Sequence, residues 1–412
     1  MKSFKTHLLE AAAPKKNTHM THIEDQVLYG GVEGARQAIL ALRSLRDMLS
    51  GSNNSSVDVS QKWDGAPAVF AGVDPRDGEF FVAKKGIFNK TPKVYKSHKD
   101  IDTDTSGDLA KKLKIAYTEL KKMDIKEVIQ GDILFTQDDL KVKNISGKRY
   151  ITFHPNTIVY AVPANSPDAQ EIKSAKIGIV FHTSYSGKSF ETMKASFGVD
   201  VSKMKKIPSV WAQDAMLRDL SGTVTMTKVE TAEVNSLLTQ AGTIFQKIAG
   251  TTLRELESNN EISGMIEQFN NSFVRAGQKI TNSKGHVHDL INWIHDKYAK
   301  VEAERKTEKG RIGVRQKRDE ILSFFSPRNE KNLALVFDLM LAIQNAKEYI
   351  ITKLDQVKKV NTFILTKDGF RVTGSEGFVA IDGLDGSAVK LVKRMEFSQN
   401  NFSPNVIKGW DR

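Results

Sequence analysis

The stretch VSQKWDGAPAVF, residues 59–70, decides how the rest of this sequence is interpreted. Short apolar runs flank a turn signal of Asp, Gly and Pro, which is typical of two strands joined by a tight connection. Lys62 therefore stands at the end of a predicted strand. It is either a solvated turn residue or a nucleophile held on a bend. The pattern K-x-D-G alone occurs by chance in roughly one chain in ten of this length, so the remaining sequence must decide.

The overall composition favours a polyanionic partner. The 412 residues include 61 Lys and Arg against 49 Asp and Glu, a formal charge of +12, which favours nucleic acid over an anionic membrane surface. Cysteine is absent, which excludes disulfides and thiolate sites. No apolar run approaches the roughly 20 residues that span a bilayer, and the N-terminus lacks a signal-peptide pattern. These features predict a cytoplasmic protein with no membrane association.

The distribution of helix and strand signals predicts an α+β protein with an insertion. Residues 1–56 form a predicted N-terminal helical segment that ends in a loop. Residues 57–190 alternate short β-branched or aromatic runs with turns, and the same texture returns in residues 361–412. Residues 191–360 have the apolar spacing of helices. We therefore expect an inserted helical domain within one strand-rich domain.

Four further segments follow K-x-D-G in a definite order. They are QGDILF (130–135), IGIVFH (177–182), SEGFVA (375–380) and AVKLVK (388–393). Two of them place an acid beside a glycine, one ends a hydrophobic strand with an aromatic residue, and the last carries two lysines on a predicted strand.

In this order the segments resemble the covalent nucleotidyltransferases, which comprise ATP-dependent DNA and RNA ligases and mRNA capping enzymes. The resemblance covers residues 57–190 and 361–397, and SEGFVA close to AVKLVK is its most specific part. It implies a nucleotidyltransferase (adenylation) domain of two packed antiparallel sheets with the nucleotide in a groove between them. It also implies that Lys62 attacks the α-phosphorus of ATP to form lysyl–AMP.

The resemblance assigns a role to each position of the motifs. Lys390 would contact the α-phosphate with Lys393 beside it, although residues three apart on a regular strand face opposite sides. Such cations neutralise the triphosphate and disfavour protonation of a neighbouring amine. Asp132 and Glu376 would hold the ribose or a divalent cation, Mg²⁺ or Mn²⁺. The other implied nucleotide-binding residues are Asp64, Gly65, Lys84, Lys85 and Phe181, the last stacking on adenine.

Three departures from the family pattern are visible. Pro67 stands where many DNA ligases have arginine, and Asp132 replaces the usual glutamate. Only nineteen residues follow Lys393, too few for the C-terminal oligonucleotide-binding (OB) barrel of most DNA ligases. We therefore expect the inserted helical domain, residues 191–360, to hold nucleic acid. Arg311, Arg315 and Arg318 have the spacing of one basic helical stripe suited to phosphates, unless the run is simply a solvated face.

Histidines 286, 288 and 295 lie on a predicted helix without an acid that completes a metal site, so core or surface roles are favoured over zinc. The sequence as a whole predicts a monomeric ATP-dependent polynucleotide ligase of phage-like type, acting on nicked or single-stranded DNA and accepting RNA-containing ends. An RNA ligase is the alternative within the class, and guanylyltransferase is a more distant one. A non-catalytic nucleic-acid-binding or virion-associated protein with a relic fold is the alternative of another class.

Overall fold

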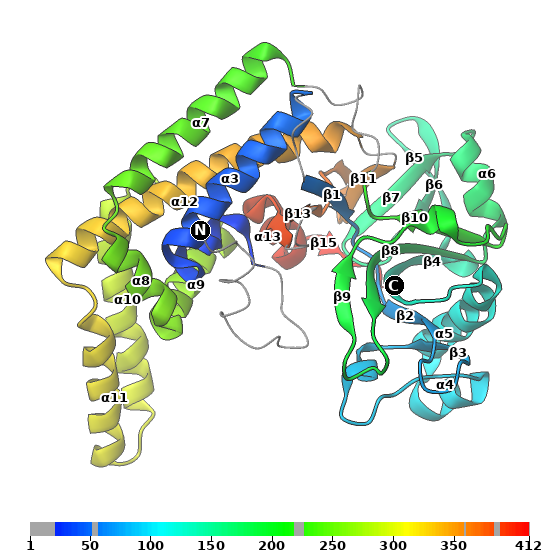
Figure 1. Ribbon diagram of the computed structural model, residues 1–412, viewed down its shortest axis with the longest axis horizontal. Helices are drawn as coiled ribbons and strands as arrows, with labels where there is room; N and C mark the ends of the chain where they lie inside the picture. The colour runs from blue at the N-terminus through cyan, green and yellow to red at the C-terminus, as the bar shows by residue number, and fades with distance from the viewer. Residues whose placement is uncertain (1–20, 52–56, 218–225, 358–359, 383–387, 412) are drawn as a thin grey trace.

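The computed structural model describes residues 21–51, 57–217, 226–357, 360–382 and 388–411. Within these ranges the fold is α+β, as the sequence predicts. A helical body occupies one side of the molecule and two six-stranded sheets occupy the other, with a three-stranded sheet between them (Figure 1).

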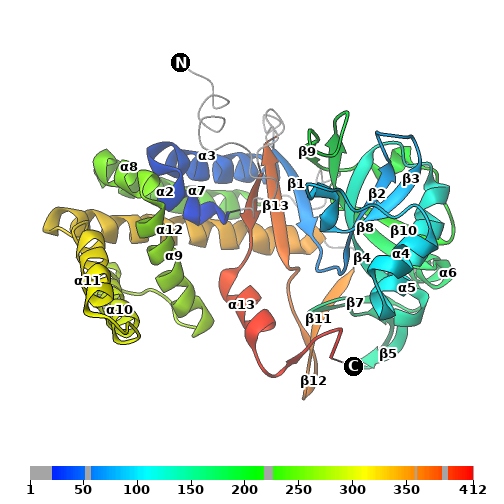
Figure 2. The same cartoon turned by 90° about the horizontal axis from the view of Figure 1, so that it is seen from below.

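The helical body has one continuous hydrophobic core. Its longest helix, α12, has 28 residues and a length of about 42 Å, and it runs from α10 and α11 to the three-stranded sheet (Figure 2). The helices of this body are α2 (Gln26–Tyr29), α3 (Gly31–Leu49), α7 (Lys228–Lys247), α8 (Gly250–Ser258), α9 (Asn260–Arg275), α10 (Ser283–Ala303), α11 (Glu308–Leu322) and α12 (Pro327–Leu354).

Local sequence explains why these helices form and where they begin. On α3 the residues Ala35, Ile39, Leu42 and Leu49 recur at helical spacing and are buried against the other helices. Helix α7 begins with a capping box in which Thr227 and Glu230 satisfy free backbone N–H groups.

The strands form three sheets, here called A, B and C. Sheet A has the order β1-β13-β14, sheet B the order β10-β8-β4-β2-β3 with β9 on β8, and sheet C the order β12-β11-β7-β6-β5 with β15 on β11. The strands are β1 (Val57–Lys62), β2 (Ala68–Val73), β3 (Phe80–Ala83), β4 (Val128–Thr136), β5 (Lys141–Ile145), β6 (Lys148–Phe153), β7 (Ile158–Pro163), β8 (Ile177–Ser186), β9 (Lys194–Phe197), β10 (Val210–Asp214), β11 (Asn361–Thr366), β12 (Gly369–Val372), β13 (Gly377–Asp382), β14 (Ala388–Leu391) and β15 (Val406–Ile407).

Sheets B and C pack face to face. Their shared core contains Leu134 and Trp211 from sheet B together with Ile151, Phe153 and Tyr160 from sheet C. Helix α5 covers the opposite face of sheet B. The remaining helices are α4 (His98–Asp104), α5 (Gly107–Leu120), α6 (Pro167–Ser174) and α13 (Arg394–Phe402), and the 3-10 helices are η1 (Ile23–Asp25), η2 (Lys85–Phe88), η3 (Lys121–Met123), η4 (Gln137–Asp139), η5 (Val201–Lys203) and η6 (Asp355–Val357).

The domain boundaries differ from those predicted by the sequence. Strands β9 and β10 add residues 194–214 to sheet B, so the strand-rich body continues past residue 190. Because β10 pairs with β8 in parallel, sheet B is mixed and not wholly antiparallel.

The N-terminal helices and sheet A also depart from the predicted domains. Helices α2 and α3 belong to the core of the helical body and do not form a separate segment. Val59, Phe378 and Leu391 of sheet A are buried in the same helical core. Sheet A therefore connects the two bodies. No helix in the described part of the chain is both long and apolar enough to cross a bilayer.

Candidate active site

Lys62 and Glu376 meet at the end of sheet A. Lys62 is the last residue of β1 and pairs in register with Gly377, the first residue of β13. The Lys62 ammonium forms an ion pair with the Glu376 carboxylate. The Glu376 side chain is 10% exposed and that of Lys62 is 27% exposed. Antiparallel pairing of β1 and β13 thus joins two groups that lie more than 300 residues apart in the sequence.

The environment of Glu376 favours its protonated form. Burial raises the pKa of this carboxyl to about 7, against an ordinary value of 4.5, even though the adjacent Lys62 charge lowers the pKa. The negative charges of Asp64 and Asp132 add to the rise. Glu376 is therefore a better proton acceptor near neutral pH than an exposed glutamate.

A glycine must follow Glu376. Gly377 has a φ of +145°, and a Cβ at this position would lie 2.6 Å from the Leu391 carbonyl oxygen. This conformation and this close approach explain the acid–glycine pair of the segment SEGFVA.

Only one of the two predicted lysines near β14 lies beside Lys62. Lys390 pairs with Val379 of β13 and is partly buried. Burial and then the nearby Lys62 charge lower its pKa. Lys393 lies beyond the end of β14, and its ammonium is 4.0 Å from the Asp355 carboxylate. Lys393 is therefore not a residue of the strand, and it lines the small pocket that Glu376 also lines.

Asp64 anchors the turn that follows Lys62. Its buried carboxylate accepts hydrogen bonds from Asn156 Nδ2 (2.6 Å), Thr157 N (2.7 Å) and Ile158 N (2.8 Å). Its backbone N–H donates to the Tyr160 hydroxyl (2.6 Å). The Asp64 carboxylate therefore fixes the turn to sheet C, and its contact with the nucleotide stays a prediction.

Gly65 permits close packing against Asp132. A Cβ on Gly65 would lie 2.6 Å from the Asp132 Cβ. The turn is also joined to β4 by a hydrogen bond from Ala66 N to the Ile133 carbonyl (2.9 Å). Asp132 itself stays 22% exposed at its side chain. Gly65 thus has a packing role, and Asp132 keeps a carboxylate available to a ligand.

The aromatic residue predicted to stack on adenine faces the wrong side of sheet B. Phe181 is fully buried in the core beneath α5. The next residue, His182, points to the face that carries Asp132: its Nε2 is 3.6 Å from Asp132 Oδ2, and its side chain is 30% exposed. Sequence reasoning missed His182, although strand alternation offered it as the other choice.

The predicted basic residues Lys84 and Lys85 do not join this cluster. They lie just after β3, where the Lys84 ammonium is 3.3 Å from the Asp104 carboxylate. Lys85 is exposed at the start of η2. The structure thus shows a half-buried, ion-paired Lys84 beside an exposed Lys85.

The arginine stripe is helical, as predicted, but each arginine has an acidic partner. Arg315 pairs with Glu302 and Glu308, both at 2.7 Å. Arg311 pairs with Glu308 (3.7 Å) and Arg318 with Asp319 (2.8 Å). Helix α11 also lies at the end of the helical body farthest from the sheets (Figure 1). Both observations weaken the prediction that this stripe binds phosphates.

The histidines of α10 are explained by packing. His286 is buried among Phe269, Phe273 and Phe337, and its Nε2 lies 2.8 Å from Asn270 Oδ1. Burial lowers its pKa to about 4. The other two histidines of this helix, His288 and His295, are exposed.

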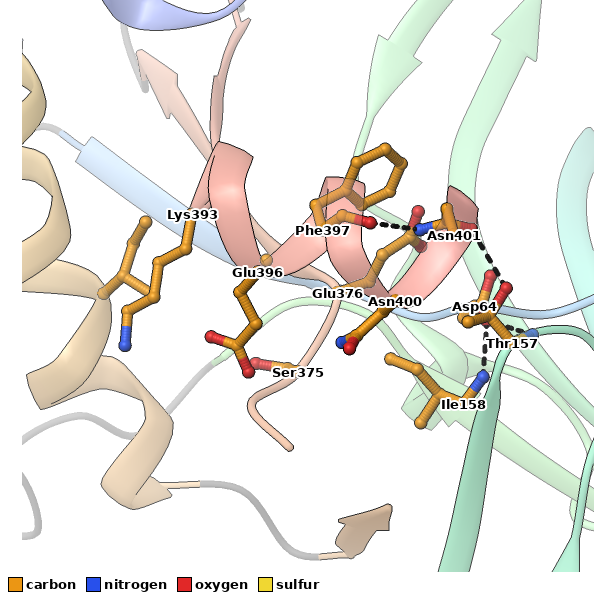
Figure 3. A pocket seen from close by; sticks show the side chains of 12 residues that line it. Asp64, Thr157, Ile158, Ser375, Glu376, Lys393, Glu396, Phe397, Asn400 and Asn401 are labelled. Atoms are coloured by element: carbon orange, nitrogen blue, oxygen red, sulfur yellow. Dashed lines mark hydrogen bonds between the residues drawn. The ribbon is translucent and has the colours of Figure 1, made fainter. Parts of the chain in front are cut away.

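The C-terminal residues support the loop that anchors Asp64. Asn401 Oδ1 lies 3.0 Å from the Thr157 hydroxyl, which also receives a hydrogen bond from Lys408 Nζ (3.0 Å). Gly409 N donates to the Asn156 carbonyl (2.7 Å). Figure 3 shows α13 lying along a small pocket whose lining includes Asp64, Thr157 and Asn401. Sequence reasoning missed this support because these residues match no motif.

The predicted metal site has two carboxylates. They belong to Asp132 and Glu376, and Glu376 is engaged with Lys62. The described residues contain no group of three or more metal-ligating side chains placed to hold an ion. Mg²⁺ commonly binds one or two protein carboxylates together with substrate phosphates. The partly exposed Asp132 fits that mode.

Fold and site together define an α+β protein with a largely buried Lys–Glu pair, a second lysine and a second acid where its two bodies join. The chain belongs to a family of unknown function, DUF6267, whose model matches residues 17–406. No curated protein and no solved structure matched the chain.

Proposed function

We propose that this chain is an ATP-dependent polynucleotide ligase that acts through a lysyl–AMP intermediate. The contact between Lys62 and Glu376 carries the proposal, because it joins the predicted nucleophile and the acid of the segment SEGFVA at one point of the fold. Lys390 and Asp132 lie close enough to influence the charge state of the cluster. Perturbed titratable groups gathered in this way are typical of reactive sites.

In the proposed first step, Lys62 Nζ bonds to the α-phosphorus of ATP as the bond to pyrophosphate breaks. The ammonium must first lose a proton, and Glu376 is the contacting group that can accept it. Lys390 is placed to offset phosphate charge. Asp132 would hold a Mg²⁺ ion, which neutralises the phosphates when bound.

In the later steps AMP passes from Lys62 to the 5′-phosphate of a polynucleotide, and a 3′-hydroxyl then displaces AMP to form the phosphodiester. DNA as the preferred substrate, with RNA-containing ends accepted, stays a prediction. An RNA ligase uses the same chemistry, so sealing assays with matched DNA and RNA nicks distinguish the two.

The test is incubation with Mg²⁺ and ATP labelled at the α-phosphate, followed by a denaturing gel. The parent chain should carry an acid-labile label, and Lys62→Ala should carry none. Lys84→Ala is the matched control, because it also removes a lysine at a strand end and should label normally. A parent chain that takes no label would favour the non-catalytic nucleic-acid-binding alternative. A Lys62→Ala variant that still takes the label would refute the assignment of Lys62 as the nucleophile.

A further inference from the structure

Sheet C has an unbalanced charge. Its strands contain Lys141, Lys143, Lys148, Arg149 and Arg371 but no Asp or Glu. Residues 140–167 contain no Asp or Glu at all. The first four of these cations lie inside this run, within the nine residues 141–149. The β5–β6 hairpin (residues 141–153) therefore concentrates positive charge at one edge of the molecule.

The three lysines of this hairpin share one face. In the antiparallel register Lys141 lies opposite Thr152, Lys143 opposite Tyr150, and Lys148 opposite Ile145, and directly opposed residues point to the same side. The alternate residue Ile151 points the other way, into the core between sheets B and C. The three lysines therefore lie on the outer face. Lys141 and Ile145 are four residues apart on β5, about 14 Å, and Lys148 lies opposite Ile145, so the lysines extend over about this length.

These lysines are exposed and lack acidic partners among the described residues. All three are solvent-exposed. Lys141 Nζ donates only to the Asp138 backbone carbonyl (3.2 Å). The side chains of Ile145 and Tyr150 lie on the same face and are buried in an apolar cluster between the lysines and the rest of sheet C. This differs from the α11 stripe, where every arginine is already neutralised by an acid.

We propose that the outer face of the β5–β6 hairpin is the nucleic-acid interface of this protein, with Lys141, Lys143 and Lys148 contacting the phosphate backbone. The inference rests on the proposed function, which requires a polynucleotide substrate. Unpaired cations attract phosphates and release counterions, whereas ion-paired arginines must first break their own contacts. Contacts of this kind bind without reading sequence.

The test measures binding of the full chain to a fluorescent nicked duplex by anisotropy, between about 50 and 200 mM salt. The triple variant Lys141→Ala, Lys143→Ala, Lys148→Ala should lower the slope of log K against log salt by about 2.7. The affinity of the parent should therefore fall about 40-fold more over this range than that of the variant. The matched control Arg311→Ala, Arg315→Ala, Arg318→Ala removes the same charge and should keep the parental slope.

Further arms separate charge from folding and from catalysis. Lysine-to-arginine replacement at the three hairpin positions should preserve the slope, and melting curves should show that all variants fold. AMP labelling without nucleic acid should be unchanged in the hairpin variant. If the parent takes no label but binds through the hairpin, the interface stands and the ligase proposal fails. An unchanged slope in the hairpin variant would overturn the interface. A decrease of the slope in the α11 variant equal to that in the hairpin variant would also overturn the proposed interface. Binding of the protein to phosphatidylserine vesicles but not to the duplex would overturn it as well.

Discussion

Replacing Glu376 by Gln should stabilise the fold above neutral pH while it abolishes AMP transfer. The carboxyl has a pKa of about 7 in the folded chain against an ordinary value of 4.5. The folded state therefore holds this proton more tightly than the unfolded state does, and folding free energy is lost as the pH rises from about 4.5 to about 7. The difference amounts to about 3 kcal/mol above pH 7.

The amide introduced by Glu376→Gln would resemble the protonated carboxyl in shape and charge, so the variant escapes this cost. The pKa already includes the attraction to Lys62, and no separate correction for the ion pair is needed. For a chain of 412 residues unfolding as one unit, about 3 kcal/mol corresponds to a rise in Tm of about 4 °C.

The assay is thermal or urea unfolding of Glu376→Gln and the parent from about pH 4.5 to about pH 8. The two should have nearly equal stability at the acidic end and diverge as the pH increases. Lys62→Met is a control of opposite sign, because it removes the counter-charge and should destabilise the fold at the alkaline end. A Glu376→Gln variant less stable than the parent at the alkaline end, or a difference independent of pH, would refute the reasoning.

Two further predictions concern the face of sheet B that carries Asp132. Gly65→Ala should cost about 1–3 kcal/mol of stability and impair AMP labelling, because its Cβ would lie 2.6 Å from that of Asp132; Gly313→Ala in α11, where a Cβ meets nothing within 4 Å, should be neutral or stabilising in the same melting assay. His182→Ala should raise the KM for ATP in the labelling reaction with a smaller effect on kcat, whereas Phe181→Leu should lower Tm and leave KM unchanged; the reverse pattern would return the nucleotide contact to Phe181.

Several features of the site were predictable because they depend on local pattern. The turn after Lys62, the strand beginning at Gly377 and the strand carrying Lys390 all lie where the apolar runs and turn residues indicate. The order of the motifs also singled out Lys62 and Glu376 as site residues, and the structure brings the two into contact, although the sequence predicted Glu376 as a ligand of the ribose or a metal and not as a partner of Lys62. The arginine spacing correctly indicated one helix.

Other features depend on contacts that local pattern does not contain. The arginines of α11 find acids on α10 and on their own helix, so helical spacing alone overstated their free charge. Strand β10 joins β8 in parallel, a pairing that local signals cannot indicate because it depends on where the chain returns. The anchoring of Asp64 by residues 156–158, and their support by Lys408, likewise involves segments far apart in the chain.

What the sequence by itself determined was the set of elements and the chemical types at their ends, because hydrophobic periodicity and turn chemistry act over a few residues. Only the tertiary structure decided which side of each strand faces the core. Alternation allowed either Phe181 or His182 to lie on the side of Asp132, and the packing of α5 against sheet B buried the phenylalanine. The same is true of the hairpin lysines, whose shared outer face follows from the packing of sheet C against sheet B.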